Sequence, residues 1–391
     1  FNSNQTMNFF QLSVLILALT GASAAIAPRR KTSGWVLATE YNVNTEWDSF
    51  KQAFRKRYSP EEELVRREIF ETSLKRAAES NIDNVRGGGK HVFGVTKFSD
   101  RTPEEFDAVK GRKGTGSPHN LESVTIPTDP EAFSASSVDW TALGYTTPVK
   151  NQGQCGSCWA FSATEQIESQ YMLAGNAAWE LSVQQIASCT KGAFGCGGGD
   201  TTVAYEQLMS GETKSGMETG GVASNSMAPY TQSMYETCLG PLCTVSCKDS
   251  GIGNLTEMIP EEALTGPYVG VTGYSYATTP CTGTCKSQNL TLLNANLAST
   301  APASICVNAA SWGDYVGGVM TTAACGGYGY NDLDHCVQLT GFDMTADEPY
   351  YIVRNSWATN WGEDGYIYLS ATDNTCGVAD EATFVDVSFD M

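Results

Sequence analysis

Thirteen cysteines constrain this 391-residue chain more than any other feature. So many thiols are atypical of the reducing cytosol, and an odd number leaves at least one of them unpaired. Two cysteines lie three residues apart in "NQGQCGSCWAF", residues 151–161, directly before an aromatic, helix-like stretch. A C-x-x-C spacing is compatible with half of a metal site, with a redox pair, or with one reactive thiol beside a structural cysteine. The spacing alone does not decide among these three.

An apolar stretch near the start of the chain is typical of a signal peptide. It covers residues 12–19 and is followed by small residues at 22–24, of the kind that precede signal cleavage. The stretch is too short for a stable membrane-spanning helix. We therefore expect residues 7–27 to be a signal peptide. The expected destination is the secretory pathway, either a lysosome- or vacuole-like compartment or the exterior.

The charges are divided unevenly along the chain. Residues 28–133 carry 18 Lys and Arg against 17 Asp and Glu, whereas the residues from 134 onward carry 6 against 26. This contrast predicts two bodies, in which the basic residues of the first help hold it against the acidic second. Protonation of carboxylates should weaken that attraction. The acidic part would repel phosphates, which disfavours nucleic-acid binding.

The first body is predicted to be mainly helical. Ser59 can cap a helix within 44–85, Pro60 suits its first turn, and the apolar positions approximate one stripe: Leu64, Ile69, Phe70, Leu74 and Ala77. We expect a short strand in "HVFGVTKF" and a small helix at "SDRTPEEF". Residues 111–136, rich in Gly and Pro, are predicted to be a linker and the most exposed place for a maturation cut.

The second body, residues 137–391, is predicted to be α+β. Residues 158–174 and 181–189 suggest helices, and 211–303 is loop-rich. Short β-rich segments then follow at 303–310, 335–342, 350–355 and 365–370. Helices early and strands late favour an α+β fold over a doubly wound sheet.

A thiol nucleophile needs a base to share its proton and a third group to orient that base. Of the three histidines, His91 and His119 fall outside the second body, which leaves His335 as the candidate base. Asn355, twenty residues later, offers an amide that could hold the imidazole in one tautomer. Cys158 lies where a helix begins, and the positive end of a helix favours a thiolate. Gln152 could donate a hydrogen bond to a developing oxyanion.

Four segments resemble the papain family of cysteine peptidases: "PVKNQGQCGSCWAFSA", "LSVQQIASC…GCGGG", "LDHCVQLTGF" and "RNSWATNWGEDGY". The resemblance covers residues 134–391. It implies that Cys158 is the nucleophile, His335 the base and acid, Asn355 the orienting amide and Gln152 the oxyanion donor. Trp357 would shield the Asn355–His335 contact from water. The implied fold has a helical lobe and a β-barrel-like lobe, with the thiol and the histidine facing each other across a cleft.

Residues 28–110 resemble the inhibitory propeptides of papain-type enzymes. The matching positions of the helical motif are Glu62, Arg66, Ile69, Phe70 and Asn81, with Ser73 and Ala77 in place of two usual members. A second motif matches at Gly94, Phe98 and Asp100, with Thr96 in place of an asparagine. The resemblance implies a zymogen whose prosegment occupies the cleft until acidification loosens it.

The resemblance also implies how several cysteines pair. Cys155 is structural, in a pair Cys155–Cys196, and the other implied bridges are Cys189–Cys238 and Cys325–Cys376. A zinc site is improbable in a secreted chain, and no metal or cofactor is expected. For an insertion at about 240–288, one hypothesis is nested bridges, Cys243–Cys285 and Cys247–Cys281. Cys306 and Cys336 could form a bridge in a pocket wall or remain two buried thiols.

The resemblance places Glu381 on the floor of the pocket that receives the second side chain before the cut. A carboxylate there would favour a cationic side chain, and Asp200 would add negative potential from the opposite wall. The alternative is that Glu381 faces solvent. Gly198 and Gly199 fit a role in binding the substrate backbone, because glycine permits close approach. Asn254 and Asn289 begin glycosylation sequons.

These observations predict a cysteine endopeptidase made as a secreted zymogen, acting on proteins or peptides as a monomer and inhibited by its own propeptide. The rival hypothesis is a catalytically silent binding or storage protein with the same fold. Retention of Cys158, His335, Asn355 and Gln152 together argues against that rival.

Overall fold

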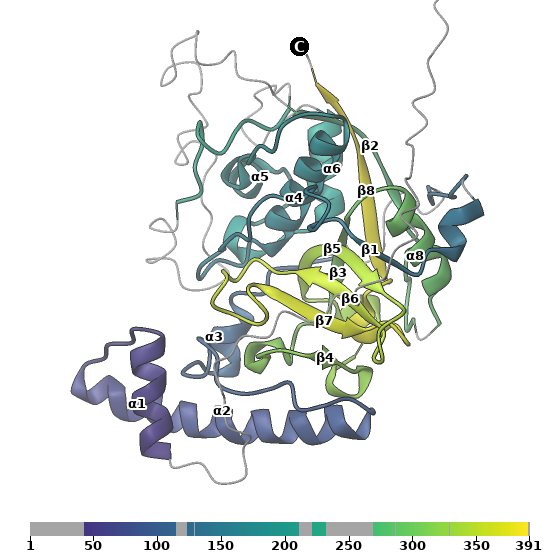
Figure 1. Ribbon diagram of the computed structural model, residues 1–391. Coiled ribbons are helices and arrows are strands. Elements are labelled where there is room, and N and C mark those ends of the chain that lie inside the picture. The colour runs from purple at the N-terminus through teal and green to yellow at the C-terminus, as the bar shows by residue number, and fades with distance from the viewer. Residues whose placement is uncertain are drawn as a thin grey trace, which may run out of the picture.

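The structure is a computed structural model that describes residues 43–114, 123–128, 130–210, 221–231, 269–285, 287–327 and 329–389 (Figure 1). The expected signal peptide at 7–27 lies outside these residues, as do Asn254, Cys238, Cys243 and Cys247. Within the described residues, no helix has the length and apolar character needed to cross a membrane.

The prosegment contributes helices α1 (Val43–Ala53), α2 (Pro60–Arg86) and α3 (Pro103–Asp107). Helix α2 begins as predicted, with Pro60 in its first turn and the Ser59 hydroxyl accepting a hydrogen bond from the Glu62 amide. The predicted apolar stripe is wrong at Leu64, which is 74% exposed. Phe70, Leu74 and Ala77 of the stripe are buried as predicted. The buried face of α2 also includes three polar residues, which apolar periodicity does not mark: Ser73, Asn81 and Asn84.

The strand predicted in "HVFGVTKF" does not form. Phe93 makes only an isolated bridge, to Tyr315. The Asn81 side chain takes the place of a neighbouring strand, because its Oδ1 accepts from the amides of Val92 and Phe93 and its Nδ2 donates to the Phe93 carbonyl. The small helix expected at "SDRTPEEF" is confirmed as α3, which Thr102 caps.

The body that follows has two lobes (Figure 1). The helical lobe holds α4 (Cys158–Leu173), α5 (Val183–Cys189) and α6 (Thr201–Ser210). Helix α4 is buried on nearly all sides, as expected for a helix enclosed by other elements rather than lying at a surface. The prosegment helix α2 lies along the opposite lobe, next to β4, where Asn84 of α2 donates a hydrogen bond to the Val319 carbonyl (Figure 1).

The second lobe is built on one sheet with strand order β2-β8-β3-β5-β6-β7-β4, and β1 pairs with β5. The strands are β1 (Ser137–Asp139), β2 (Val269–Tyr276), β3 (Ala303–Val307), β4 (Val319–Met320), β5 (His335–Asp343), β6 (Tyr350–Arg354), β7 (Tyr366–Ser370) and β8 (Glu381–Phe389). The strands predicted at 303–310, 335–342, 350–355 and 365–370 are confirmed. The segment 211–303, predicted to be loop-rich, contains β2 and α8 (Leu290–Ser299), so that prediction is wrong there.

Strand register brings the chemical groups of the sheet together. Strand β5 is buried along its whole length and begins with His335. Its pairing with β3 sets Val307 opposite His335 and Cys306 opposite Cys336. Strand β3 also pairs with β8 on its other edge, which sets Cys306 opposite Glu381, the first residue of β8. Three neighbouring strands thus carry the candidate base and the candidate pocket floor at one end of the sheet.

Candidate active site

Cys158 is the first residue of α4 and is fully buried. It is the free cysteine among the described residues. The preceding residue, Ser157, does not cap the helix with its side chain; its hydroxyl instead hydrogen bonds to the Tyr230 hydroxyl at 2.8 Å. The Cys158 sulfur accepts a hydrogen bond from the amide of Gly111 at 3.2 Å. A prosegment backbone amide therefore faces the thiol directly.

His335 and Asn355 form the pair that the sequence predicts. The His335 Nε2 lies 2.8 Å from the Asn355 Oδ1. That oxygen also accepts a hydrogen bond from the Ser356 amide at 2.8 Å, so it is an acceptor and the Nε2 carries the proton. In this tautomer the His335 Nδ1 has a free lone pair, and it has no hydrogen-bond partner among the described residues. It can therefore receive a proton.

Gln152 is buried and fixed at both ends of its amide. Its Oε1 accepts from the Ser356 hydroxyl at 2.6 Å. Its Nε2 donates to the Cys155 carbonyl at 2.8 Å and to the Val109 carbonyl of the prosegment at 2.6 Å. The amide that the sequence assigns to an oxyanion is thus already binding a carbonyl oxygen.

Burial keeps both reactive groups neutral in this state. It raises the pKa of the Cys158 thiol to about 11, against hydrogen bonds from the backbone of Cys336 and Gly111 that lower it. It also lowers the pKa of His335 to about 3, against the hydrogen bond with Asn355. The expectation that the helix terminus favours a thiolate therefore does not hold while the prosegment covers the site, because desolvation is the larger effect.

Aromatic rings cover the His335–Asn355 pair. Trp357 stacks on the His335 ring with centroids 4.7 Å apart. Phe98 and Phe106 of the prosegment meet Trp357 edge-on at 5.1 and 5.4 Å. Trp357 thus lies between the prosegment and the histidine, which is compatible with the shielding role expected of it.

Residues 111–113, which the sequence assigns to the linker, lie instead in the cleft. Arg112 forms a parallel bridge with Gly199. The Gly199 amide donates to the Gly111 carbonyl at 2.9 Å, and the Gly199 carbonyl accepts from the Lys113 amide at 2.7 Å. A Cβ on Gly199 would lie 2.6 Å from the Trp159 ring, so a side chain there would clash. Gly198 has φ +111°, which favours glycine.

The Arg112 side chain fills the pocket that the sequence predicts around Glu381. Its Nη2 lies 2.5 Å from the Glu381 Oε2 and its Nε 3.3 Å from the Asp200 Oδ2. Its Nη1 donates to the Tyr330 carbonyl at 2.8 Å, and the guanidinium lies 4.2 Å from the centroid of the Tyr330 ring. Glu381 is 1% exposed, so the alternative in which it faces solvent is wrong.

The disulfides match the expected pairs in part. Cys155–Cys196 and Cys325–Cys376 form. Cys189 is disulfide-bonded, and its expected partner Cys238 lies outside the described residues. The nested bridges are wrong, because Cys281 pairs with Cys285. The open question about the pocket wall is settled as a bridge, Cys306–Cys336. Adjacent β3 and β5 bring those two residues into register, which sequence spacing does not reveal.

Groups that could hold a metal are few. Among the described residues, Cys281, Cys285 and Asp380 have their ligand atoms within 4.8 Å of one another. Both sulfurs are committed to a disulfide, so the group offers a single carboxylate.

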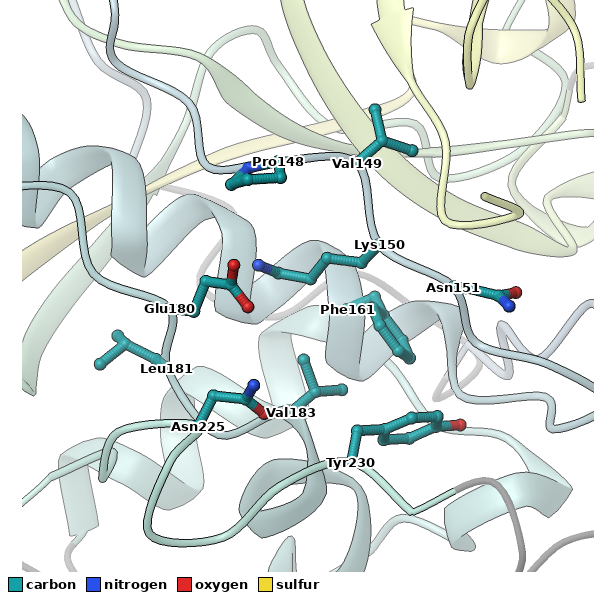
Figure 2. Close-up of a pocket in the computed structure, with 10 residues that line it drawn as sticks. All are labelled: Pro148, Val149, Lys150, Asn151, Phe161, Glu180, Leu181, Val183, Asn225 and Tyr230. Atoms are coloured by element: carbon teal, nitrogen blue, oxygen red, sulfur yellow. The ribbon is translucent and has the colours of Figure 1, made fainter. Parts of the chain in front are cut away.

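A cavity of about 210 Å³ is lined in part by residues 148–151, which directly precede Gln152 (Figure 2). Figure 2 shows Lys150 extending across it toward Glu180, with Phe161 and Tyr230 lining it further along. The Tyr230 hydroxyl donates to the Gln152 carbonyl at 2.9 Å. None of the predicted catalytic residues lines this cavity. Prosegment atoms instead contact Cys158 and Gln152 directly.

Two contributors to the site carry little sequence signal. Arg112 falls in the expected linker, although the run "KGRK" places cations just ahead of an acidic body. Tyr330 belongs to a short turn, Tyr330–Asp332, and no sequence motif marks it as part of the site. Only the folded chain brings its ring beneath the Arg112 guanidinium.

Comparisons with known proteins agree with this geometry. Residues 134–385 match the family described as papain family cysteine protease, and residues 47–106 match the cathepsin propeptide inhibitor domain. Cysteine proteinase 1 of Dictyostelium discoideum is 32% identical over 352 residues, 84% of this chain and 89% of that protein. Digestive cysteine proteinase 1 of Homarus americanus is 32% identical over 355 residues, 88% and 95% of the two chains.

Solved proenzymes show the same arrangement. The digestive procathepsin L2 proteinase of Tenebrio molitor is 28% identical with a TM-score of 0.63, and the match covers 88% of this chain and 99% of that one. The stem bromelain precursor is 27% identical with a TM-score of 0.64, covering 88% and 98%. The chain therefore belongs to the papain family of cysteine proteases, which are cysteine-type endopeptidases, and it carries the propeptide inhibitor domain of a zymogen.

Proposed function

We propose that Cys158, His335, Asn355 and Gln152 are the catalytic residues of this endopeptidase. The His335 Nδ1 takes the thiol proton, and the Cys158 sulfur attacks the scissile carbonyl. The Gln152 Nε2 and the Cys158 amide stabilise the oxyanion. His335 then protonates the leaving amine and activates water to release the acyl group. Asn355 holds the imidazole in the required tautomer.

The observation that carries this proposal is the way the prosegment contacts these groups. The Val109 carbonyl oxygen accepts from the Gln152 Nε2, as an oxyanion would, and the Gly111 amide binds the Cys158 sulfur. Backbone atoms thus occupy the positions where a substrate would react. An N–H rather than a carbonyl carbon faces the sulfur, so no bond of the bound prosegment is presented for attack.

The pocket bounded by Glu381 and Asp200 is proposed to accept a basic side chain at the second position before the cut. Arg112 supports this, because two carboxylates and the Tyr330 carbonyl meet its guanidinium there. A buried carboxylate left without a cation would carry a desolvation cost, which a basic substrate offsets. Gly198, Gly199 and Trp357 would line the path of the substrate backbone.

A secretory setting fits the disulfides that the described residues hold, Cys155–Cys196, Cys281–Cys285, Cys306–Cys336 and Cys325–Cys376. Asn289 is exposed, and its Oδ1 caps α8 by accepting from the Leu292 amide. The Asn289 Nδ2, to which a glycan would attach, takes no part in that hydrogen bond, so a glycan and the cap are compatible. We propose passage through the secretory pathway to an acidic compartment or the exterior.

The test is hydrolysis of two fluorogenic dipeptides, with arginine or phenylalanine at the second position. Both are assayed at acidic and neutral pH with thiol, after removal of the prosegment. We expect activity that is lost in Cys158→Ser and includes the arginine substrate. Glu381→Gln should lower the arginine-to-phenylalanine rate ratio about 10- to 100-fold, since a hydrogen bond to a charged group contributes about 1.5–3 kcal/mol.

Asp347→Asn is the matched control, because it removes one exposed acid and should leave the ratio unchanged. Hydrolysis of the phenylalanine substrate alone would contradict the acidic-pocket proposal. Absence of all activity in the processed wild type would favour the silent binding protein.

A further inference from the structure

The Arg112 guanidinium is bound like a ligand rather than packed like a surface side chain. Its charge meets Glu381 and Asp200, its Nη1 meets the Tyr330 carbonyl, and the Tyr330 ring lies against its face. The Arg112 side chain is 3% exposed. By contrast, the neighbouring Lys113 is exposed to solvent. Arg112 therefore provides a specific side-chain recognition between the prosegment and the substrate pocket.

The bound segment runs through the cleft in one clear direction. Val109 meets Gln152, Gly111 meets Cys158, and Arg112 then enters the Glu381 pocket. A substrate with arginine two positions before its cut must run the other way, from the Glu381 pocket toward Cys158. Bound to its own enzyme, the prosegment is reversed relative to such a substrate, so it inhibits and is not cut.

Once the prosegment leaves the cleft, its direction is no longer fixed, so another enzyme molecule can bind it in the direction of a substrate. If a second enzyme molecule binds the same stretch in the productive direction, Arg112 occupies the Glu381 pocket and Lys113 takes the next position. The bond beside the second molecule's Cys158 is then Lys113–Gly114. Gly114 has no side chain to obstruct the leaving side, and both Lys113 and Gly114 are exposed in the zymogen.

We propose that the Lys113–Gly114 bond is the enzyme's own first processing site, cut by a second copy of this chain after residues 109–113 leave the cleft. This proposal rests on the arginine preference proposed above. The match to the cathepsin propeptide domain ends at residue 106, before this stretch. Arg112 therefore has two roles, first inhibiting its own molecule and then marking the bond that frees it.

The reaction is an ordinary hydrolysis and balances without a cofactor. The Cys158 thiolate of the second molecule forms a bond to the Lys113 carbonyl carbon, and the bond from that carbon to the Gly114 nitrogen breaks. The proton on His335 goes to the Gly114 nitrogen, which leaves as a free amine. Water then gives a proton to His335 and its hydroxide to the thioester carbonyl carbon, and the bond from that carbon to the Cys158 sulfur breaks. This releases the Lys113 carboxylic acid, which loses its proton to solvent, and regenerates the thiolate.

The experiment uses the full-length Cys158→Ala chain as substrate, because it cannot cut itself. A small amount of processed wild-type enzyme is added at acidic pH, and new amino termini are read by intact mass and terminal sequencing. The first new chain should begin at Gly114, and its rate of formation should rise in proportion to the added enzyme. In the same background, Arg112→Leu should slow this cut at least tenfold, although it also frees the segment from the cleft. Lys113→Ala is the matched control and should retain the cut.

Two further readouts separate this inference from its premise. The fluorogenic phenylalanine and arginine dipeptides, assayed in parallel, report peptidase activity and arginine preference. A synthetic peptide of residues 107–117 presents the bond without any folded prosegment and should be cut after Lys113. A first cut elsewhere, an intact peptide or an unaffected Arg112→Leu chain would overturn the inference, provided that both dipeptides are cleaved. Loss of cleavage of the dipeptides themselves would overturn the proposed function.

Discussion

A single ion pair dominates the contact between prosegment and pocket. Arg112 and Glu381 are 3% and 1% exposed at their side chains, whereas Lys90 and Glu348, which also join the prosegment to the body, are 78% and 32% exposed. Exposed pairs contribute about 0–1 kcal/mol. Removing one partner of a buried pair leaves an uncompensated charge and costs about 3–5 kcal/mol. The Arg112 pair therefore contributes more to keeping the cleft closed than the exposed Lys90–Glu348 pair does.

Acidification should weaken this pair. Burial raises the pKa of Glu381, the Asp200 carboxylate raises it further, and Arg112 lowers it. The Arg112 charge lowers the Glu381 pKa, so this ion pair favours prosegment binding at higher pH and weakens as acid protonates Glu381. Three phenols near Glu381 stay neutral in acid because burial raises their pKa values: Tyr205, Tyr274 and Tyr276. The Asp380 carboxyl also interacts with Arg112, and burial raises its pKa to about 7, so it becomes protonated in acid.

Lys97 does not add to this response in acid. Burial, with Arg101 and Lys56 nearby, lowers its pKa to about 7 from the ordinary 10.5. Protonation of Lys97 therefore weakens prosegment binding progressively as pH falls from about 10.5 to about 7. Below that pH the effect is nearly constant. The decrease in binding below neutral pH must come from carboxylates and from His335, whose pKa burial lowers to about 3.

We predict that Arg112→Gln abolishes much of the pH dependence of opening. The variant cleft should open at neutral pH as readily as the wild type does in acid, because no cation lowers the Glu381 pKa. Opening is read by the rate at which iodoacetamide labels Cys158, which does not depend on processing. Arg86→Gln, an exposed prosegment change, is the control. A wild-type pH profile in Arg112→Gln would contradict the prediction.

The residues of the site differ in how well the sequence around them predicts their role. Cys158, His335 and Asn355 lie in long, specific motifs, so their meeting could be predicted. Glu381 could be placed only by resemblance, and its partner Arg112 not at all. The register of β3 against β5, which pairs Cys306 with Cys336, is a property of the folded sheet. Long-range pairing of that kind leaves no trace in sequence spacing.

At the scale of elements, helix α2 docks through a polar anchor at its end. The buried Asn84 accepts from the Thr321 amide at 2.7 Å and donates to the Lys90 and Val319 carbonyls. The glycines after the helix allow this approach, since a Cβ on Gly87 would lie 2.3 Å from the Thr321 hydroxyl.

We predict that Asn84→Ala loosens the zymogen. It leaves the Thr321 amide without its partner, at a cost of about 1–3 kcal/mol, or a 5- to 150-fold larger open population. Labelling of Cys158 at neutral pH should rise by that factor. Ile82→Ala, on the exposed face of the same helix, should leave the rate unchanged. Equal rates in the two variants would show that α2 docks by other contacts.

Elements with strong local signals were predictable, and those defined by distant partners were not. Capping residues and apolar content identified α2 and α4. The segment at 92–95 carries strand-like residues but bonds to the Asn81 side chain, so it forms no strand. Strand β2 lies in a stretch that the sequence marks as loop-rich, and its pairing with β8 joins residues more than one hundred positions apart.

At the scale of the whole molecule, the uneven charge distribution along the sequence predicts that the prosegment binds the acidic body. The prosegment cations Arg76 and Lys110 reach Asp314 and Asp334 of the acidic body, in addition to the Arg112 pair. We propose that this prosegment closes the active site over a neutral, buried thiol.

Alkylation of Cys158 tests that claim most directly. The zymogen and the enzyme processed by pepsin in acid are treated with iodoacetamide at pH 6 without reductant, and the labelled peptide is mapped by mass spectrometry. A pKa of about 11 leaves about one thiol in 10⁵ ionised at pH 6, and the thiolate is the nucleophile. We predict that Cys158 is labelled at least a hundredfold faster in the processed enzyme than in the zymogen. Equal labelling rates in the two forms would contradict the account.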